Sequence, residues 1–439
     1  MAADTFCDSL WHATAEPAPP LSPGGGDDTA DVAIVGAGYL GLSTALHLAE
    51  HGARVVVTEA HEPGFGASGR NTGFVVPSFV ASLGPDEVEA ALGRARAARL
   101  CRLVGGAGER VFELVRKHRI ACDATQAGWL QPAHSRARVD FLARRQSDWA
   151  RHGKSLALLD REETHRLTGA RSWHGALLDP SGGHVNPLGY ARGLARAALA
   201  AGVTIRGGSR VTKLDRRGRG WTLTTSAGRI TADRAVLATN ALTGALAPEL
   251  ARSVVPLVVH QIATRPLDPE NRRRLLPGNE SLSDTRRDIF AVRWTPDGRL
   301  VTGGAAALAA GARGRLRRSL VARLRRLLPI AGPLAAEYAW SGVIALTRDR
   351  LPRVFEVDRG LYAAVGCNGR GLALSTALGG ELAAFLASPD PGALPVPIAR
   401  PAPIPGHLIA RHLPSVLLPW ARLRDRLESG AVREGPASD

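Results

Sequence analysis

The feature that most constrains this chain is a glycine-rich turn between a buried strand and a helix. Residues 31–35 read DVAIV, a short apolar run typical of a buried parallel strand. Residues 36–41 read GAGYLG and fit the pattern G-x-G-x-x-G. A helical pattern follows over 40–51, and a second strand is expected over 54–57. This β-α-β beginning predicts a Rossmann-like α/β domain.

Each glycine of this turn has its own physical task. Gly36 permits the tight turn, Gly38 lets the backbone approach a pyrophosphate, and Gly41 lets the helix pack on the strand. The helix N-terminus then offers unpaired N–H groups to the phosphates. Glu59 follows the second strand, 18 positions after Gly41, and its carboxylate can accept from ribose hydroxyls. The pattern therefore predicts a dinucleotide site, without separating flavin from nicotinamide.

A second glycine-rich loop lies just beyond this carboxylate. Residues 64–73 read GFGASGRNTG, with small residues and the donors Arg70 and Asn71. Such a loop suits a backbone that runs along an extended cofactor. A surface loop without a ligand is the alternative interpretation.

The strand–glycine–helix pattern recurs later in the chain, which indicates a discontinuous domain. Residues 184–241 alternate helix and strand patterns, and residues 361–387 repeat strand, glycine-rich loop and helix. The intervening stretches are helical and arginine-rich, or alternate strand-like runs with a basic helix at 315–328. We expect a lead-in at 1–30, a nucleotide-binding domain at 31–86, 160–247 and 336–390, a second domain at 87–159 and 248–335, and a surface-packed tail at 391–439.

The tail carries an apolar stripe with arginines between its members. Pro414 and Pro419 argue against one continuous helix. We expect the stripe to pack on the protein itself, with contact to a membrane surface as the alternative. The stripe consists of Leu408, Leu413, Leu417, Trp420, Leu423 and Leu427.

Composition argues against several other classes of protein. The net charge is +16, yet the arginines are spread over the whole chain, so we interpret the charge mainly as compositional bias and expect no nucleic-acid partner. The four cysteines have no paired spacing, which argues against a disulfide scaffold and a metal site. No long apolar run and no signal-peptide pattern is present, so we expect a cytoplasmic protein.

The ordered set of motifs resembles the FAD-dependent oxidoreductases of the D-amino acid oxidase family. Within it, the chain looks most like the γ-glutamylputrescine oxidoreductase and glycine/sarcosine oxidase branch. The motifs are DVAIVGAG (31–38) with Glu59, GASGRN (66–71), GGHVNP (182–187), LATNA (237–241), WSG (340–342), TRDRLP (347–352) and GCNGRG (366–371). The resemblance covers about residues 9–430 and implies a second domain whose antiparallel sheet lies over the flavin.

The resemblance also implies roles for individual residues. Those expected at the ADP half are Gly36, Gly38, Gly41, Glu59 and, through its backbone, Val211. Those expected along the pyrophosphate, ribityl chain and flavin are Ser68, Arg70, Asn71, Thr72 and Thr239. Those expected at the pyrimidine edge of the flavin are Gly369, Arg370, Gly371 and Leu372.

Two departures from the relatives concern the cofactor and the electron acceptor. Residues 342–347 contain no cysteine and residues 68–70 no histidine, so we expect FAD to be bound non-covalently. Sarcosine oxidase relatives use a lysine near the flavin to react with oxygen. Residues 250–335 and 361–387 contain no lysine, which leaves both O2 and another electron acceptor open.

The activity implied is oxidation of a C–N bond in a small amine or amino acid, by hydride transfer to flavin N5, giving an imine that hydrolyses. Arg293 is the candidate for holding a substrate carboxylate. The alternative is that strand alternation places its side chain on the outer face of the sheet. His260 either accepts the amine proton or is a core histidine, and Trp340 either walls the site or packs in the core. An RNA-modifying flavoprotein is the alternative from another class.

Overall fold

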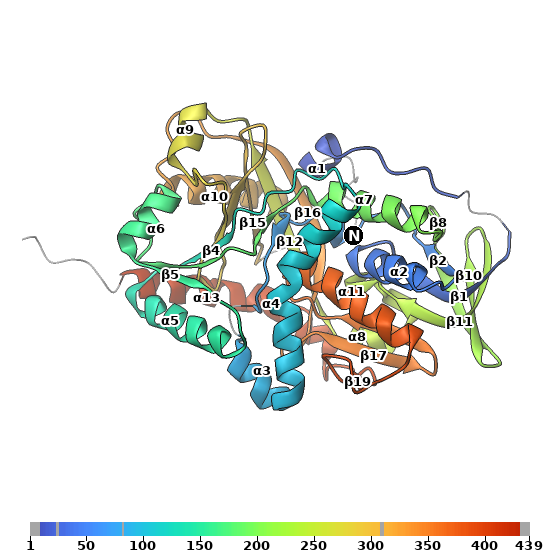
Figure 1. The fold of residues 1–439 in the computed structure, drawn as a ribbon. Helices are drawn as coiled ribbons and strands as arrows, with labels where there is room; N and C mark the ends of the chain where they lie inside the picture. The colour runs from blue at the N-terminus through green and yellow to red at the C-terminus, as the bar shows by residue number, and fades with distance from the viewer. Residues whose placement is uncertain (1–8, 23–25, 81–82, 308–310, 431–439) are drawn as a thin grey trace, which may run out of the picture. The chain divides into compact units, whose positions relative to one another are not determined.

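The computed structural model describes residues 9–22, 26–80, 83–307 and 311–430 (Figure 1). These residues form two compact units, each assembled from three stretches of chain, so the mixed α/β architecture with interleaved parts is confirmed. So far as they are described, the first unit comprises Met1–Gln126, Ser181–Leu257 and Ser341–Arg411. The second comprises Ala127–Pro180, Val258–Trp340 and His412–Asp439.

A largely parallel sheet organises the first unit, in the order β19-β17-β18-β11-β1-β2-β8. Strands β18, β11, β1, β2 and β8 are parallel to one another, and β10 and β9 continue from β11 as an antiparallel meander. The strands are β1 (Asp28–Val35), β2 (Val55–Thr58), β3 (Phe74–Val75), β7 (Gly183–His184), β8 (Thr204–Arg206), β9 (Val211–Arg217), β10 (Gly220–Thr225), β11 (Gly228–Leu237), β17 (Arg353–Asp358), β18 (Leu361–Val365) and β19 (Ile398–Ala399).

Helices of the first unit pack closely against one another beside this sheet. α11 contacts both α2 and α4, and α2 also contacts α7. The Ser43 hydroxyl donates to the Thr376 carbonyl oxygen at 2.7 Å, which ties α2 to α11. Trp221, Leu223 and Leu250 belong to a separate apolar cluster with inward-facing residues of β1 and β11. The helices are α1 (Leu10–Thr14), α2 (Tyr39–Glu50), η2 (Ala67–Gly69), α3 (Pro85–Leu92), α4 (Arg94–Lys117), α7 (Pro187–Ala200), η3 (Asn240–Leu242), η4 (Gly244–Leu246), α8 (Pro248–Arg252), α11 (Gly371–Ala387) and α12 (His407–Ala410).

A mainly antiparallel sheet organises the second unit, in the order β16-β12-β15-β14-β13-β4-β6-β5. Its strands are β4 (Trp129–Pro132), β5 (Ala157–Leu159), β6 (Ala176–Asp179), β12 (Val255–Thr264), β13 (Ser281–Ser283), β14 (Ala291–Trp294), β15 (Leu300–Ala305) and β16 (Ala336–Leu346). Its helices are α5 (Arg136–Arg151), α6 (Arg161–Thr168), α9 (Pro269–Arg274), α10 (Ala312–Leu327) and α13 (Leu413–Gly430). Two of the five boundaries between the units fall inside strands, one in β12 and one in β16.

The basic helix expected near 315–328 is α10, and it covers one face of the second sheet. Leu316, Leu320, Leu324 and Leu327 are buried at helical spacing, as the sequence predicted, and they join the apolar clusters of this unit. The arginines occupy the remaining faces of the helix. Helical periodicity in a basic segment therefore identified its buried side correctly.

Two of the expected domain boundaries need correction. Residues 87–126 lie in the first unit, because α4 packs along α11, whereas we placed 87–159 in the second domain. Residues 160–180 lie in the second unit, because β6 pairs with β4 and β5. The expected lead-in also contains structure, since α1 buries Leu10 and Trp11.

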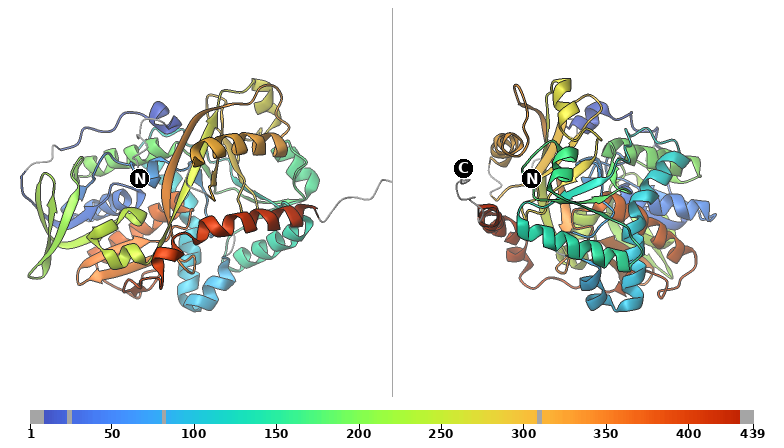
Figure 2. Two further views of the ribbon diagram at one scale, coloured as in Figure 1. Left: turned by 180° about the vertical axis from the view of Figure 1, so that it is seen from behind. Right: turned by 60° about the vertical axis from the view of Figure 1, so that its left-hand side comes forward.

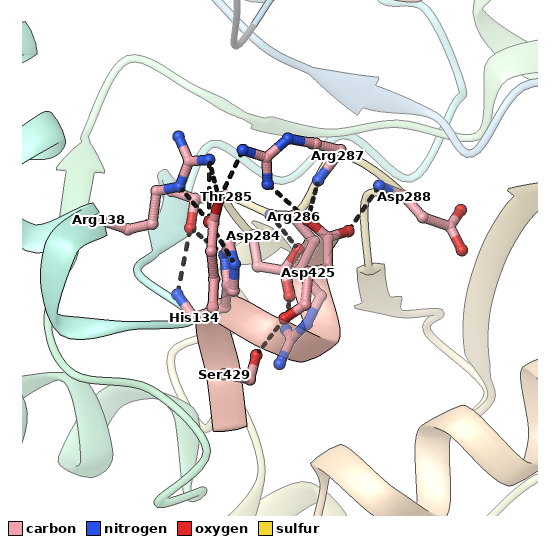
Figure 3. A network of polar contacts seen from close by, with 10 residues as sticks. His134, Arg138, Asp284, Thr285, Arg286, Arg287, Asp288, Asp425 and Ser429 are labelled. Atoms are coloured by element: carbon pink, nitrogen blue, oxygen red, sulfur yellow. Dashed lines mark hydrogen bonds and ion pairs between the residues drawn. The ribbon is translucent and has the colours of Figure 1, made fainter. Parts of the chain in front are cut away.

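The tail contradicts the prediction that prolines would interrupt it, since α13 runs through Pro419. Pro414 lies in the first turn, where a missing N–H group costs little. Charged contacts hold the rest of the helix (Figure 3). Asp425 accepts from the backbone N–H groups of Arg287 and Asp288, each at 3.0 Å, and Glu428 accepts from Arg287 Nη2 at 2.6 Å. Within the described residues, no helix combines the length and apolar character required to cross a bilayer.

We expect this network to make stability depend on pH through Glu428. Its hydrogen bond from Arg287 is the first of the contacts that lower the pKa of Glu428 from 4.5 to about 2. A depressed carboxyl pKa stabilises the folded state above the ordinary pKa, and that stabilisation is lost as the pH falls towards the folded value. Glu428→Gln should therefore lower the melting temperature at pH 7, and the difference from wild type should shrink progressively below pH 4.5.

Calorimetric scans of both proteins across this pH range test the expectation. Glu162→Gln is the control, because the Glu162 side chain is 73% exposed and lies 3.7 Å from Arg171. It should leave the melting temperature nearly unchanged at each pH. A Glu428 effect that stays constant down to the lowest measurable pH would contradict the role given to this carboxylate.

Candidate functional site

The candidate cofactor site lies at one edge of the parallel sheet in the first unit. Parallel strands bring their carboxyl ends to the same edge. β1 is followed there by Gly36, β2 by Glu59, β11 by the segment 238–240, and β18 by Gly366. Segments separated by hundreds of positions in the sequence therefore meet along one edge.

The turn after β1 leaves no room for side chains at its glycines. Gly36 has a φ of +108°, and a Cβ there would lie 3.0 Å from the carbonyl oxygen of Ala238. A Cβ on Gly41 would overlap the carbonyl oxygen of Gly36, and one on Gly38 would lie 2.9 Å from Ser68 Oγ. The backbones of β1, β11 and α2 are consequently packed as closely as glycine permits.

Glu59 closes the turn from the side of β2. Its Oε2 accepts from the backbone N–H of Ala37 at 2.9 Å and its Oε1 from that of His61 at 3.1 Å. Burial raises the pKa of Glu59, although these backbone N–H groups oppose the rise. The Ser209 N–H donates to the Glu59 carbonyl oxygen at 2.8 Å, which brings the start of β9, at Val211, beside this carboxylate.

The second glycine-rich loop is held by the amide of Asn71. Its Nδ2 donates to the carbonyl oxygens of Ser68 at 2.8 Å and Ala67 at 3.0 Å, and its Oδ1 accepts from the Gly73 N–H at 2.8 Å. Ser68 Oγ accepts from the Tyr39 N–H at 3.2 Å, at the first turn of α2. Asn71 and Ser68 thus fix the loop, Thr72 included, against the start of that helix.

The side chain of Arg70 extends from the same loop in another direction. Its Nε donates to the Phe65 carbonyl oxygen at 2.9 Å, and its Nη1 donates to the Ser341 carbonyl oxygen at 3.2 Å. The guanidinium also lies 5.1 Å from the centre of the Phe65 ring. The arginine joins the loop to β16, in which Ser341 lies.

The loop between β18 and α11 forms the other end of the site. Gly366, Asn368 and Gly369 all have positive φ values, of +89°, +50° and +89°. The Asn368 side chain stabilises this conformation by accepting from the Thr347 N–H at 2.9 Å and donating to the Gly366 carbonyl oxygen at 2.6 Å. Arg370 is the residue before α11, Gly371 begins the helix and Leu372 is buried in its first turn. Thr239, after β11, shares a hydrogen bond of 2.7 Å with Thr243.

Two helices begin at this edge, and their N-cap residues, Gly38 of α2 and Arg370 of α11, make no side-chain cap hydrogen bond. In the first turn of α2, the Tyr39 N–H already donates to Ser68 Oγ at 3.2 Å. Uncapped N-terminal amides are attracted to anions because each carries a partial positive charge. The edge offers donors at two helix starts and one carboxylate acceptor, a combination suited to a nucleotide with an anionic middle.

The sheet of the second unit has a polar face. Strand pairing aligns one row across β4, β13, β14, β15 and β12, because Leu130 pairs with Leu282, Ser283 with Ala291, and Gln261 with Gly303. The neighbouring residues Leu130, Leu282 and Val292 point to the α10 side, where they pack with Leu324. The alternating row therefore lies on the opposite face. Its members are Gln131, Ser283, Ala291, Gly303 and Gln261.

Arg293 lies in the adjacent row of that same face, together with Trp129 and Ser281. It is 1% exposed, and its Nη1 donates to the Trp294 carbonyl oxygen at 2.9 Å. His260 lies on the other face. His260 pairs with Gly304, and a Cβ built on Gly304 would lie 3.3 Å from Leu320 of α10. This pair therefore faces α10. The register thus separates His260 from Arg293, while Trp340 is buried in β16.

Gln131 and Gln261 are candidate site residues that the sequence analysis did not identify. Gln131 is fully buried, and neither atom of its amide has a hydrogen-bond partner among the described residues. Gln261 is 5% exposed and its Oε1 has no partner in the same part of the chain. A buried amide without a partner is costly. The available signal was a glutamine inside a short apolar strand, as in the residues WLQP of β4.

Comparisons with known proteins agree on one family. A family model described as FAD dependent oxidoreductase matches residues 31–385. Gamma-glutamylputrescine oxidoreductase of Escherichia coli is 35% identical over 364 residues, covering 82% of this chain and 84% of that protein. The probable oxidoreductase OrdL of Rhizobium meliloti is 33% identical, covering 95% and 97%. The crystal structure of glycine oxidase from Geobacillus kaustophilus superposes with a TM-score of 0.68 at 24% identity, covering 82% and 95%.

The residues of the first unit fit the cofactor that this family description names. Gly38 leaves a space beside Ser68 Oγ that a Cβ would fill, directly at the start of α2, and it makes no side-chain cap hydrogen bond itself. Glu59 supplies an acceptor suited to ribose hydroxyls, and the start of α11 supplies a second set of donors.

Gly38→Ala should weaken FAD binding at least about tenfold, because the added methyl group would occupy the approach to the first turn of α2. The flavin absorbance retained after gel filtration and the melting temperature with added FAD measure the effect. Gly106→Ala is the matched control, since a Cβ at that α4 position meets nothing within 4 Å. If Gly38→Ala retains the cofactor as well as Gly106→Ala does, the turn does not carry the pyrophosphate.

Proposed function

Because this chain belongs to the family of FAD dependent oxidoreductases, we propose that it oxidises the C–N bond of a small amine or amino acid. The observation that supports this substrate class is the polar sheet face of the second unit. There a buried arginine shares the sheet face with Gln131, whose amide atoms both lack a partner among the described residues, and with Gln261, whose Oε1 lacks one. The similarity to a gamma-glutamylputrescine oxidoreductase supports the same class of substrate.

The reaction balances with few demands on side chains. FAD, which Gly38, Glu59 and the start of α11 would hold, would supply the two-electron oxidant for removal of a hydride from the carbon next to the substrate nitrogen. The nitrogen loses one proton to solvent, and a C=N bond forms. Water then adds to this imine, the C–N bond breaks, and a carbonyl compound and the free amine leave. The protein has to bind the substrate, orient that carbon and restrict water.

Arg293 would bind a substrate carboxylate. A guanidinium can hold both oxygens of a carboxylate in a planar pair of hydrogen bonds, which fixes orientation as well as position. At 1% exposure the contact would be desolvated, so its removal should be costly.

Gln131 and Gln261 would recognise further polar atoms of the substrate. They stand at the two ends of one row across five neighbouring strands, about 19 Å apart at the usual strand spacing. Between them the row contains only Ser283, Ala291 and Gly303, whose side chains are small or absent. A small extended molecule would fit along this stretch, with Arg293 beside it.

We propose that FAD is bound non-covalently. The sequence places no cysteine at 342–347, and Cys367 is the cysteine in the loop before α11. Burial raises the pKa of the Cys367 thiol, which keeps it protonated and unreactive as a nucleophile.

A dehydrogenase that passes electrons to an acceptor other than O2 is the second candidate. Lysine is absent from 258–340 and from 341–411, so no lysine ammonium from these stretches can promote the reaction with oxygen. An anaerobic panel of amines and amino acids tests the proposed function, because a substrate bleaches the flavin absorbance. Rapid recovery on admitting air indicates an oxidase, whereas recovery only with an added acceptor indicates a dehydrogenase. If no amine or amino acid bleaches the flavin, the proposal is wrong.

Arg293→Gln should lower kcat/KM for carboxylated substrates by about ten- to a hundredfold, the usual loss for one charge-assisted hydrogen bond. Turnover of an amine that lacks the carboxylate should change little, and this substrate provides the internal control. Equal losses on both substrate types would show that Arg293 acts on folding or on the cofactor instead.

Gln131→Leu should raise the stability of the free protein by about 1 kcal/mol, because it removes a buried amide without partners. The same change should raise KM for the substrate. Gln146→Leu is the contrasting control, since its Nε2 already donates to the Leu156 carbonyl oxygen at 2.8 Å and its loss should destabilise. Urea unfolding and steady-state kinetics measure both effects. A Gln131→Leu protein that is less stable would contradict the assignment of this residue to substrate binding.

A further inference from the structure

The helix α13 exposes its apolar side to solvent. The side chains of Val416, Leu417, Trp420, Leu423 and Leu427 are 52–68% exposed, and their spacing places them along one stripe of the helix. The helix has 18 residues, so the stripe extends over roughly 20 Å. Isolated exposed leucines are ordinary, but a continuous apolar stripe on a surface helix indicates a contact with something else.

The opposite side of α13, which buries Leu418 and Asp425, fixes the helix to its own unit mainly through polar contacts. Asp425 is 5% exposed and accepts from Arg287 (Figure 3). Arg422 Nε donates to Asp288 Oδ2 at 2.8 Å. Glu428 accepts from Arg138 at 3.0 Å. The helix is thus anchored through ion pairs, and these contacts leave the apolar side facing outward.

The charges beside the stripe disfavour a second copy of this chain as its occupant. Arg424 and Arg426 flank the apolar positions, and the Arg424 guanidinium lies 5.0 Å from the centre of the Trp420 ring. Two such helices packed stripe to stripe would bring arginines against arginines in either orientation, between chains that each carry a net charge of +16. The occupant that these charges favour is anionic.

Helix α10 lies on the same side of the second unit as α13, as both views in Figure 2 show. It contains seven arginines and no acidic residue. Asp288 links the two helices, because its Oδ2 lies 2.8 Å from Arg422 of α13 and 3.5 Å from Arg323 of α10. The surface therefore combines an apolar stripe with a high density of guanidinium groups.

We propose that α13 docks this enzyme on the surface of an anionic lipid bilayer. The stripe inserts its leucines and Trp420 among the acyl chains near the headgroups, in the plane of the interface. Arg424, Arg426 and the arginines of α10 contact the phosphates. A nucleic acid would use the arginines but would gain nothing from the leucines. An interfacial helix uses both, and it needs no membrane-spanning segment.

Vesicle flotation with the purified, flavin-loaded protein tests this proposal. Wild type should float with vesicles of phosphatidylcholine and phosphatidylglycerol and should stay at the bottom with phosphatidylcholine alone. Leu423→Ser with Leu427→Ser should weaken binding on the order of tenfold per leucine, because each loses buried apolar area. Arg424→Gln with Arg426→Gln should weaken it on the order of thirtyfold in total.

Leu158→Ser is the matched control, since Leu158 is an exposed leucine that belongs to β5 and not to α13. It should float as wild type does, and all variants should keep their flavin absorbance and their melting temperature. Failure of wild type to float with anionic vesicles overturns the proposal. So does equal binding by the leucine variant, which would leave simple electrostatic adsorption. A wild-type dimer that the leucine variant converts to a monomer would assign the stripe to self-association and overturn it as well.

Discussion

The candidate cofactor site depends on the contact between α2 and β1. Gly41 lies so close to the carbonyl oxygen of Gly36 that no side chain fits between helix and strand. This approach sets the direction of α2 and turns its N-terminus towards the carboxyl edge of the sheet. Glu59 and Ser68 then stabilise the turn from two sides, through the N–H groups of Ala37 and Tyr39. A methyl group at Gly41 would move the helix and with it the donors that the site requires.

The parts of the fold that the sequence predicted well are local. The strand before Gly36, the helix after it and the helix after Asn186 each follow from residues within one turn of their ends. The buried side of α10 could also be predicted, because Leu316 and Leu320 repeat at helical spacing. The unit boundaries were less predictable, because they depend on which element a helix packs against. Nothing in residues 94–117 themselves states that α4 packs along α11.

The same limit applies to the site. The cofactor residues were predicted from recognisable motifs in the sequence. The polar face of the second sheet depends on strand register, which those motifs do not give. Gln131 and Gln261 are 130 positions apart, and only the pairing of five strands brings them into one row. The register also separates His260 from Arg293, which alternation alone could not decide because the bulges and pairings of both strands were unknown. The continuous course of α13 was missed for a related reason, since the ion pairs that hold it involve Asp288 and Arg287, far away in the sequence.

Two features of the second unit lower the stability of the folded state, and they suggest how this unit is specialised. An amide buried without partners at Gln131 costs free energy that an apolar residue of the same size would save. An apolar stripe turned towards water on α13 forgoes burial, although the helix could have been anchored through its leucines instead of through Asp425 and Arg422. Folding stability explains neither, and each is resolved by a second molecule of matching chemistry. A polar substrate satisfies the amide, and an anionic bilayer covers the stripe while neutralising the arginines beside it. The two features lie on different elements of the unit, so a variant at one should leave the other's ligand unaffected.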